Sequence, residues 1–143
     1  MKIAVLSRNS NLYSTRRLVE AINQRGHESV VLDHMKCDII MDEGGPVIFY
    51  DGKKIQDINA VIPRIGASVT FYGAAVVRQF EMMNVFCAVS SIALTRSRDK
   101  LRSLQVLSRS GVGMPKTAFT NFSKNENKVL KHIGQAPVVI KLL

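Results

Sequence analysis

Tryptophan is absent from this 143-residue sequence, and cysteine and proline are scarce, with two and four residues. Two cysteines cannot staple a fold of this size, which excludes a disulfide scaffold and leaves packing to hold the core. No apolar run approaches the length of a membrane span, and the apolar residues 3–6 are too few for a signal peptide. We therefore expect a cytoplasmic protein without membrane contact, with Cys37 and Cys87 reduced.

Several motifs that carry chemistry are also missing. The sequence has no phosphate loop of the type G-x-x-x-x-G-K-[ST], no G-x-G-x-x-G after its first expected strand, no H-E-x-x-H and no C-x-x-C. Its three histidines, His27, His34 and His132, are scattered, and neither cysteine lies at ligand spacing from them. A single imidazole needs partners to bind a metal, so we expect all three on the surface and no metal site in this chain.

Positive charge is concentrated in the second part of the sequence. Lys and Arg number 20 against 11 Asp and Glu, a net charge of +9. Residues 1–90 hold 10 basic and 9 acidic residues, whereas residues 91–143 hold 10 and 2. This asymmetry indicates an anionic partner (nucleic acid, nucleotide phosphates or an acidic polypeptide) or a solvated basic face. Because aromatic residues make up only 6%, we expect no direct nucleic-acid binding through stacked bases.

The first part of the chain alternates between strand and helix patterns. Short β-branched runs predict strands, and apolar residues at one-face spacing predict helices. The expected strands are residues 2–7, 28–33, 60–64 and 85–89, and the expected helices are residues 12–25 and 69–83. Strands joined by helices pair in parallel. We therefore predict an α/β fold, a Rossmann-like parallel sheet with helices on both faces.

A hairpin interrupts this alternation. Asp51-Gly52, between residues 47–50 and 53–55, is a strong signal for a two-residue hairpin turn, and we expect it at the edge of the sheet. Pro63 cannot donate to a central ladder, so it should lie near the end of its strand.

Beyond residue 90 the expected elements are shorter. They are helices at residues 91–98, 99–110 and 123–132 and strands at residues 117–120 and 137–143. Leu101, Leu104 and Leu107 should form the inner face of the second of these helices, and the capping-box spacing from Ser123 to Glu126 should begin the third. The chain stops inside an apolar run, from which we expect a piece of a longer protein.

Arg64 is expected where a parallel strand ends, at the edge of the sheet where ligands bind in such folds. With Ser7, Arg8 and Asn9 at the end of the first strand, it would frame one polar crevice. The alternative is that Arg64 pairs with Asp33 or Glu81, and that Ser10 or Asn11 caps the first helix.

A second basic group surrounds an expected helix start. Arg96, Arg98, Lys100 and Arg102 fall there, and a helix N-terminus with nearby cations is a ready anion site. The alternative is a solvated basic face. Lys141 differs, because a lysine in an otherwise apolar strand must reach an edge or meet an anion.

Five segments resemble one known family along the whole chain. They read KIAVLSRN, AVIPRIGASVTFYG, VRQFEMMN, LTRSRDKLRSLQVLSRSGVGMPKT and APVVIKLL. Together they are similar to the N-terminal part of RimK-type ligases of the ATP-grasp superfamily. The resemblance implies a Rossmann-like pre-ATP-grasp domain at residues 1–94 and the incomplete start of an ATP-grasp domain at residues 95–143.

The resemblance also implies a reaction. It is an ATP-dependent carboxylate–amine ligation that adds glutamate to the acidic C-terminal tail of a small-subunit ribosomal protein, through an acyl phosphate. Lys100 and Lys141 match the family's phosphate-contacting lysines, and we assign Arg8, Arg64, Arg96 and Arg98 to substrate binding. The glycine-rich loop and the Mg²⁺ ligands of the family lie beyond Leu143, so we expect no catalytic residue in this chain, no ligase activity from it alone and at most weak ATP affinity.

Two other classes of function fit the same charge pattern. One is a noncatalytic domain that binds an acidic protein or a nucleotide, or mediates assembly, including assembly into a homo-oligomer. The other is a basic module that binds the ribosome or nucleic acid. A reading frame that continues past Leu143 into a glycine-rich loop would favour the ligase.

Overall fold

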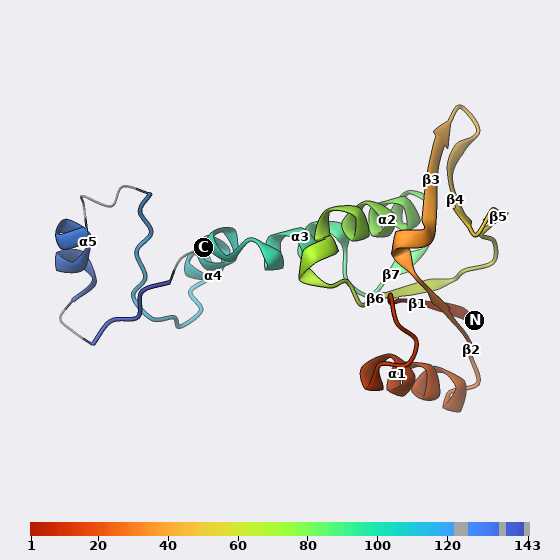
Figure 1. Ribbon diagram of the computed structural model, residues 1–143, viewed down its shortest axis with the longest axis horizontal. Coiled ribbons are helices and arrows are strands. Elements are labelled where there is room, and N and C mark those ends of the chain that lie inside the picture. Colours follow the sequence, from red (N-terminus) through yellow and green to blue (C-terminus); the bar gives the residue numbers. More distant parts are fainter. Residues whose placement is uncertain (122–125, 135–136, 142–143) are drawn as a thin grey trace. The chain divides into compact units, whose positions relative to one another are not determined.

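The computed structural model describes residues 1–121, 126–134 and 137–141 and falls into two units, Met1–Asp99 and Lys100–Leu143 (Figure 1). The first unit contains all the β-strands found in the described residues. The units are described separately below. No described helix combines the length and the apolar character that crossing a membrane requires.

A four-stranded parallel sheet forms the centre of the first unit. Its strands are β1 (Lys2–Leu6), β2 (Glu28–Leu32), β6 (Ala60–Pro63) and β7 (Phe86–Cys87), in the order β2-β1-β6-β7. The predicted α/β fold with a parallel sheet is confirmed, with β7 shorter than expected. Pro63 is the last residue of β6, as its missing N–H requires.

Alternation along β1 decides which helix covers which face of the sheet. Ile3 and Val5 pack with Ile22 of α1 (Tyr13–Gln24), whereas Ala4 and Leu6 belong to a larger cluster on the other face. That cluster includes three fully buried residues of α2 (Thr70–Met82), namely Val76, Val77 and Phe80. Figure 1 shows the two helices on opposite sides of the sheet. Because successive side chains of a strand point to opposite faces of the sheet, these four consecutive residues of β1 contribute to the core on both faces.

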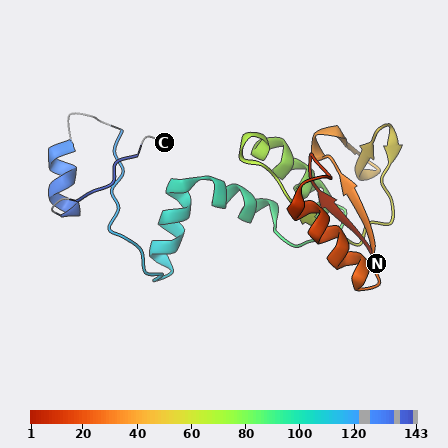
Figure 2. The same cartoon turned by 60° about the horizontal axis from the view of Figure 1, so that its bottom comes forward.

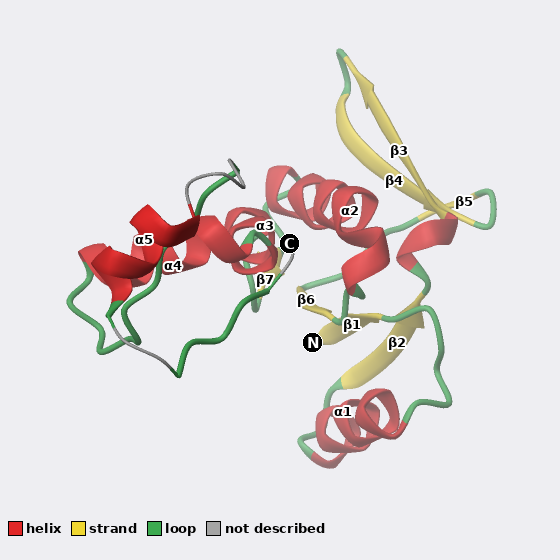
Figure 3. Ribbon diagram, turned by 60° about the vertical axis from the view of Figure 1, so that its left-hand side comes forward, coloured by secondary structure: helices red, strands yellow, loops and turns green. Residues whose placement is uncertain are grey.

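The turn at Asp51-Gly52 forms as predicted, but the hairpin lies elsewhere than expected. Both turn residues have positive φ, +48° and +74°, and they join β4 (Gly45–Tyr50) to β5 (Lys53–Lys54). The expected edge position was wrong, because β4 pairs on its other side with β3 (Cys37–Asp42), a strand that we did not predict. These three strands make a separate antiparallel sheet, order β3-β4-β5 (Figure 3).

Side chains of α2 attach this small sheet to the body of the first unit. The buried Gln79 donates from Nε2 to the carbonyl oxygens of Ile40 and Val47, at 2.9 and 3.1 Å. Tyr72 donates its hydroxyl to the carbonyl oxygen of Cys37 at 2.6 Å. Because Gln79 bonds to both β3 and β4, one side chain of α2 holds both strands of the hairpin.

The second unit has two described helices, α4 (Lys100–Arg109) and α5 (Glu126–Ile133), and residues 112–120 between them belong to neither a helix nor a strand (Figure 2). The expected strand at residues 117–120 was wrong, and residues 137–141 form none either. A strand needs a partner, and the described part of this unit offers no other strand to pair with. Consistently, Val139 and Ile140 are 83% and 81% exposed, and Leu107, expected on an inner face, is 41% exposed. The expected helix start at residues 123–125 and the last two residues of the expected terminal strand lie outside the described residues.

Candidate functional site

The carboxyl ends of β1 and β6 form the switch point of the parallel sheet. From β1 the chain crosses to β2 on one side, and it then returns to β6 on the other side of β1. In such folds the connections that leave two neighbouring strands run in opposite directions at this point and leave a crevice between them. Ligands bind in this crevice. Arg8 follows β1 by two residues and Arg64 follows β6 directly. The topology therefore brings these two predicted site residues to one edge.

Arg64 bonds to the first turn of α1 and not to a carboxylate. Its Nη2 donates to Oγ of Ser14 at 3.0 Å. The alternative partners are occupied elsewhere: Asp33 accepts from the N–H of Met35, and Glu81 accepts at the start of α3 (Ser91–Arg98). Pairing of Arg64 with Asp33 or Glu81 was therefore wrong. No sequence pattern had indicated Ser14, which lies 50 residues away.

The start of α3 is capped from two directions. Ser90 accepts the N–H of Ala93 at its Oγ, 3.1 Å away. The Glu81 carboxylate accepts the N–H of Ser91 at 2.8 Å and its hydroxyl at 2.6 Å. These caps tie α3 to the end of α2 and so fix where the last turn of α3, with Arg96 and Arg98, is placed.

Arg98 and Arg8 both reach the loop that follows β6, residues 64–66. Nη2 of Arg98 donates to the carbonyl oxygen of Ile65 at 2.7 Å. A Cβ placed on Gly66 would lie 3.6 Å from Nη2 of Arg8. We call Arg8, Arg64 and Arg98 the arginine cluster. Arg96 is exposed on α3, and substrate binding by it stays a prediction.

In the described part of the chain, Lys2 pairs with Glu28 and Arg17 pairs with Glu20, and neither ion pair involves the arginine cluster. A guanidinium group carries five N–H donors, and the bonds from Arg64 to Ser14 and from Arg98 to Ile65 use one donor each.

The N-terminus of α1 opens on the same edge of the sheet. Its N-cap residue is Leu12, and no side chain caps it, so the expected capping by Ser10 or Asn11 was wrong. Asn11 instead donates its own N–H to Asn9. Inside the fold, the hydroxyls of Ser7 and Thr15 are hydrogen-bonded at 3.0 Å, which joins the end of β1 to the first turn of α1.

His34 is buried, contrary to its expected place on the surface. It follows β2 in a short 3₁₀ helix, is 0% exposed, and neither ring nitrogen has a hydrogen-bond partner among the described residues. Burial lowers the pKa of His34, the Asp33 charge opposes this shift, and the Arg8 charge adds to it. His27 is half-buried and His132 exposed. Nothing in the sequence around a single histidine without other potential metal ligands nearby indicates whether it is buried or exposed.

We expect the free energy of unfolding to fall on acidification below the ordinary histidine pKa of 6.5 because of His34. With its pKa lowered in the fold, the unfolded chain binds the proton more readily, so the stabilisation is complete above pH 6.5 and is lost as the pH falls. One such group contributes a slope of at most about 1.4 kcal/mol per pH unit. Urea unfolding at a series of pH values should show this slope in the native sequence and lose it in His34→Leu. His27→Gln, the control, should keep it; an unchanged slope in His34→Leu would contradict the assignment.

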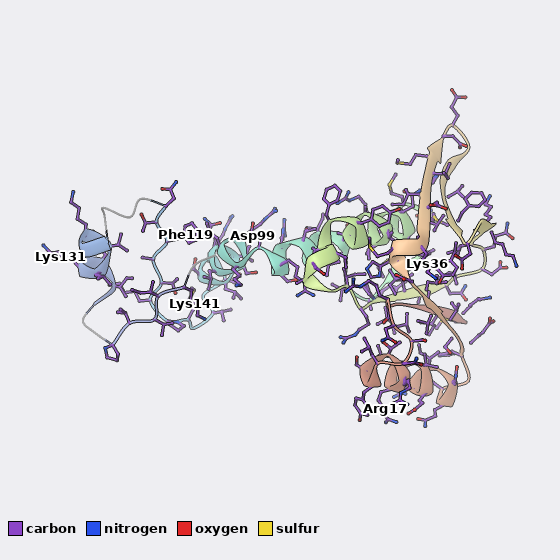
Figure 4. The ribbon with its side chains drawn as sticks, in the orientation of Figure 1. Arg17, Lys36, Asp99, Phe119, Lys131 and Lys141 are labelled. Atoms are coloured by element: carbon purple, nitrogen blue, oxygen red, sulfur yellow. The ribbon has the colours of Figure 1, made fainter. Side chains whose placement is uncertain are left out.

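The two predicted ATP-contacting lysines lie in the second unit. Lys100 is the first residue of α4, and Lys141 lies in the extended residues 137–141 (Figure 4). Both are exposed, so the expectation of Lys141 within a paired apolar strand was wrong. An exposed ammonium group suits a phosphate chemically, and contact of Lys100 or Lys141 with ATP stays a prediction. Among the described ranges, no three His, Cys, Asp or Glu residues gather closely enough to hold a metal.

Comparison with known proteins covers both parts of the chain. A family model described as the RimK PreATP-grasp domain matches residues 1–94, and one described as the RimK-like ATP-grasp domain matches residues 97–143. Probable alpha-L-glutamate ligases of Cellvibrio japonicus and Marinobacter nauticus are 59% and 61% identical to the chain. These alignments cover 99% and 100% of this chain but 47% and 48% of the relatives, so the chain spans about half their length.

Solved structures of ATP-grasp proteins share the fold. The ATP-grasp ligase PsnB, complexed with a minimal precursor, superposes with a TM-score of 0.69 at 21% identity over 93% of this chain and 50% of that one. A RimK domain protein from Sphaerobacter thermophilus gives 0.62 at 20% identity, over 82% and 41%. The expected architecture, a pre-ATP-grasp domain followed by the start of an ATP-grasp domain, is confirmed.

Proposed function

The chain belongs to the RimK family of ATP-grasp proteins, and we propose from this membership that it forms the N-terminal part of an ATP-dependent glutamate ligase. One observation carries the proposal: identity of 56–61% to probable alpha-L-glutamate ligases extends over essentially the whole chain, in both units. Identity at this level over the whole chain supports a reaction shared with these relatives.

The proposed reaction joins a carboxylate to the amine of glutamate. A carboxylate oxygen attacks the terminal phosphorus of ATP and ADP leaves, which gives an acyl phosphate. The amine then attacks the acyl carbon, phosphate leaves, and the amine loses a proton as the amide forms. Lys100 and Lys141 would donate to the phosphates, where a charge-assisted hydrogen bond is stronger than a neutral one.

The acceptor in this proposal is the acidic C-terminal tail of a small-subunit ribosomal protein. Its carboxylates would be bound by the arginines assigned to substrate, Arg8, Arg64, Arg96 and Arg98. Mg²⁺ would be held by residues beyond Leu143 and would offset charge on the phosphates. A related fold, PsnB, has been solved with Mg and ADP together. On this view the 143 residues alone have no ligase activity and bind ATP weakly, because only a minority of the nucleotide contacts can form.

The test compares this chain with a protein extended to the length of the curated relatives. With ATP, Mg²⁺, glutamate and an acidic peptide, the extended protein should release ADP and add glutamyl residues to the peptide, read by mass spectrometry. The 143-residue chain should do neither, and calorimetry should find no micromolar ATP binding to it. ADP release without a mass increment would overturn the ligase proposal. Peptide binding with no ATP turnover would also overturn it and would favour the noncatalytic alternative.

A further inference from the structure

The antiparallel hairpin sheet, β3-β4-β5, carries the opposite charge to the rest of the protein. Residues 37–57 hold five of the 11 Asp and Glu residues but only two of the 20 Lys and Arg residues. All five acidic side chains are exposed, namely Asp38, Asp42, Glu43, Asp51 and Asp57. An acidic surface on a chain of net charge +9 favours a positively charged partner at this place.

One edge of the hairpin sheet is free. β3 pairs with β4 on one side, and no other strand in the described residues pairs with its second side. Tyr72 and Gln79 of α2 bond to the carbonyl oxygens of Cys37 and Ile40, which holds β3 in place without a second strand. An edge strand presents backbone N–H and C=O groups to which another extended chain can add.

The side chains of β3 alternate between the core and the outer face of the hairpin sheet. Cys37 and Ile39 pack with the core cluster, so Asp38, Ile40 and Asp42 lie on the opposite, outer face. Ile40 is 42% exposed there. Neighbouring members of this series are about 7 Å apart along the strand. The outer face of β3 thus presents a carboxylate, an apolar group and a second carboxylate in regular order.

An open cavity of about 660 Å³ lies at the first carboxylate of this series. Its lining comes from β3, β4, the hairpin turn and α2, namely Asp38, Ile39, Ile40, Phe49, Gly52 and Tyr72. Asp38 and Phe49 are register partners, so their side chains are neighbours on the outer face. An arginine side chain suits this lining, because a guanidinium group can stack on an aromatic ring and bond to a carboxylate through two N–H groups.

The Asp38 carboxylate takes part in neither ion pair found in the described part of the chain. Lys54 lies across Phe49 from Asp38 in the register of the sheet, and the two do not pair. Burial raises the pKa of the Tyr72 hydroxyl, and the charge of Asp38 raises it further. The surroundings of the Tyr72 hydroxyl are therefore negative, which favours a cation in the cavity.

We propose that the free edge of β3 binds an extended segment of a basic partner protein, with basic residues at positions one and five of the segment and an apolar residue at position three. Asp38 and Asp42 would each face one basic side chain, and Ile40 would face the apolar one. The basic side chain opposite Asp38 would enter the cavity beside Phe49 and Tyr72. The inference goes beyond the proposed ligase and does not depend on it, because this surface includes none of the residues assigned to ATP or the acceptor tail.

A second copy of the chain fits this edge less well. Symmetric antiparallel pairing of two β3 strands about Ile40 would place Asp38 of one copy opposite Asp42 of the other. Like charges directly opposite each other in neighbouring strands are destabilising. The charge pattern of β3 therefore favours a basic strand over its own copy.

The test titrates the isotope-labelled 143-residue chain with two heptapeptides and follows its amide NMR shifts, which detect weak binding and locate it. TRTVTRT has the proposed spacing, and TTRRVTT has the same composition without it. At about 0.15 M ionic strength, charges more than about 8 Å apart are largely screened. We expect the largest shifts in β3 and about fivefold tighter binding of TRTVTRT, because only one of two adjacent arginines can face the outer carboxylates.

Single substitutions assign the contacts. Asp38→Asn and Asp42→Asn should each weaken binding of TRTVTRT about three- to fivefold, since each removes one cross-strand charge pair. Asp57→Asn is the matched control, because Asp57 is exposed, lies outside β3 and has a φ of +61° that asparagine adopts readily. It should leave binding within about 1.5-fold. Asp38→Lys should reverse the preference and bind TETVTRT, in which glutamate replaces one arginine, more tightly than TRTVTRT. Thermal melting of each variant checks that the fold is retained.

Four outcomes would overturn the inference. Equal binding of TRTVTRT and TTRRVTT, or equal effects of Asp38→Asn and Asp57→Asn, would mean that the acidic surface attracts cations without a site. Absence of shifts in β3 with either peptide would mean that the carboxylates only protect an edge strand from pairing. Sedimentation velocity tests the fourth outcome: a dimer of the native chain that Asp38→Asn dissociates would assign this surface to a second copy.

Discussion

Replacing Lys141 or Lys100 with methionine in the extended protein is expected to lower turnover by about one to two orders of magnitude. Each ammonium would donate a charge-assisted hydrogen bond to an ATP phosphate, and losing such a contact costs roughly 1.5 to 3 kcal/mol. Since about 1.4 kcal/mol corresponds to a factor of ten in rate, the expected loss follows directly. Methionine keeps a flexible apolar stem and removes only the charge. Steady-state ADP release at several ATP concentrations measures the effect.

The control for both lysines is Lys128→Met, an exposed lysine on α5. It should leave turnover unchanged, because a solvated surface charge contributes little. Lys141 is itself exposed, so its replacement should not lower the melting temperature of the 143-residue chain. Equal activity of Lys141→Met and Lys128→Met would rule out Lys141 as a phosphate contact and leave it a solvated side chain.

Changing Gly73 to alanine is expected to destabilise the first unit by about 1–3 kcal/mol, the usual cost of overpacking a core. A Cβ at this position would overlap Cγ2 of Ile65 and lie 3.1 Å from its Cδ1 and 3.2 Å from its Cγ1. Ile65 is buried, so its side chain has no free space to move into. Gly73 is thus required for close packing of α2 against the loop after β6. Urea unfolding gives the change in stability.

A double-mutant cycle tests this cause directly. Ile65→Ala removes the three heavy atoms nearest to the new methyl group, so Gly73→Ala should cost far less in that background, with a coupling of about 0.5–3 kcal/mol. An equal cost in both backgrounds would mean that helix propensity or another contact is responsible. Because Arg64 lies in this loop and Arg98 bonds to the carbonyl of Ile65, Gly73→Ala should also weaken binding of an acidic peptide by these arginines. Thus one glycine of α2 links core packing to the proposed site.

Local signals in the sequence were sufficient for most elements of the first unit. The helices and the parallel strands lie within a few residues of their expected bounds. Their signals are local, because apolar periodicity, a glycine such as Gly26 and the Asp51-Gly52 turn each influence the backbone only over a helical turn or a strand. The second unit is the counterexample. Its apolar segments predict strands at residues 117–120 and 137–143, yet a strand exists only when another strand pairs with it.

The sequence by itself determined the α/β alternation, the family, and the placement of Arg8 and Arg64 at one edge of the sheet, since the end of a parallel strand can be located without knowing its neighbours. Only the tertiary structure decided the bond from Arg64 to Ser14, the reach of Arg98 to Ile65 and the burial of His34. It also decided that Gln79 bonds to both strands of a separate hairpin sheet. These hydrogen bonds join residues 32 to 50 positions apart. Which distant groups meet depends on how whole elements pack, and no local sequence pattern encodes that packing.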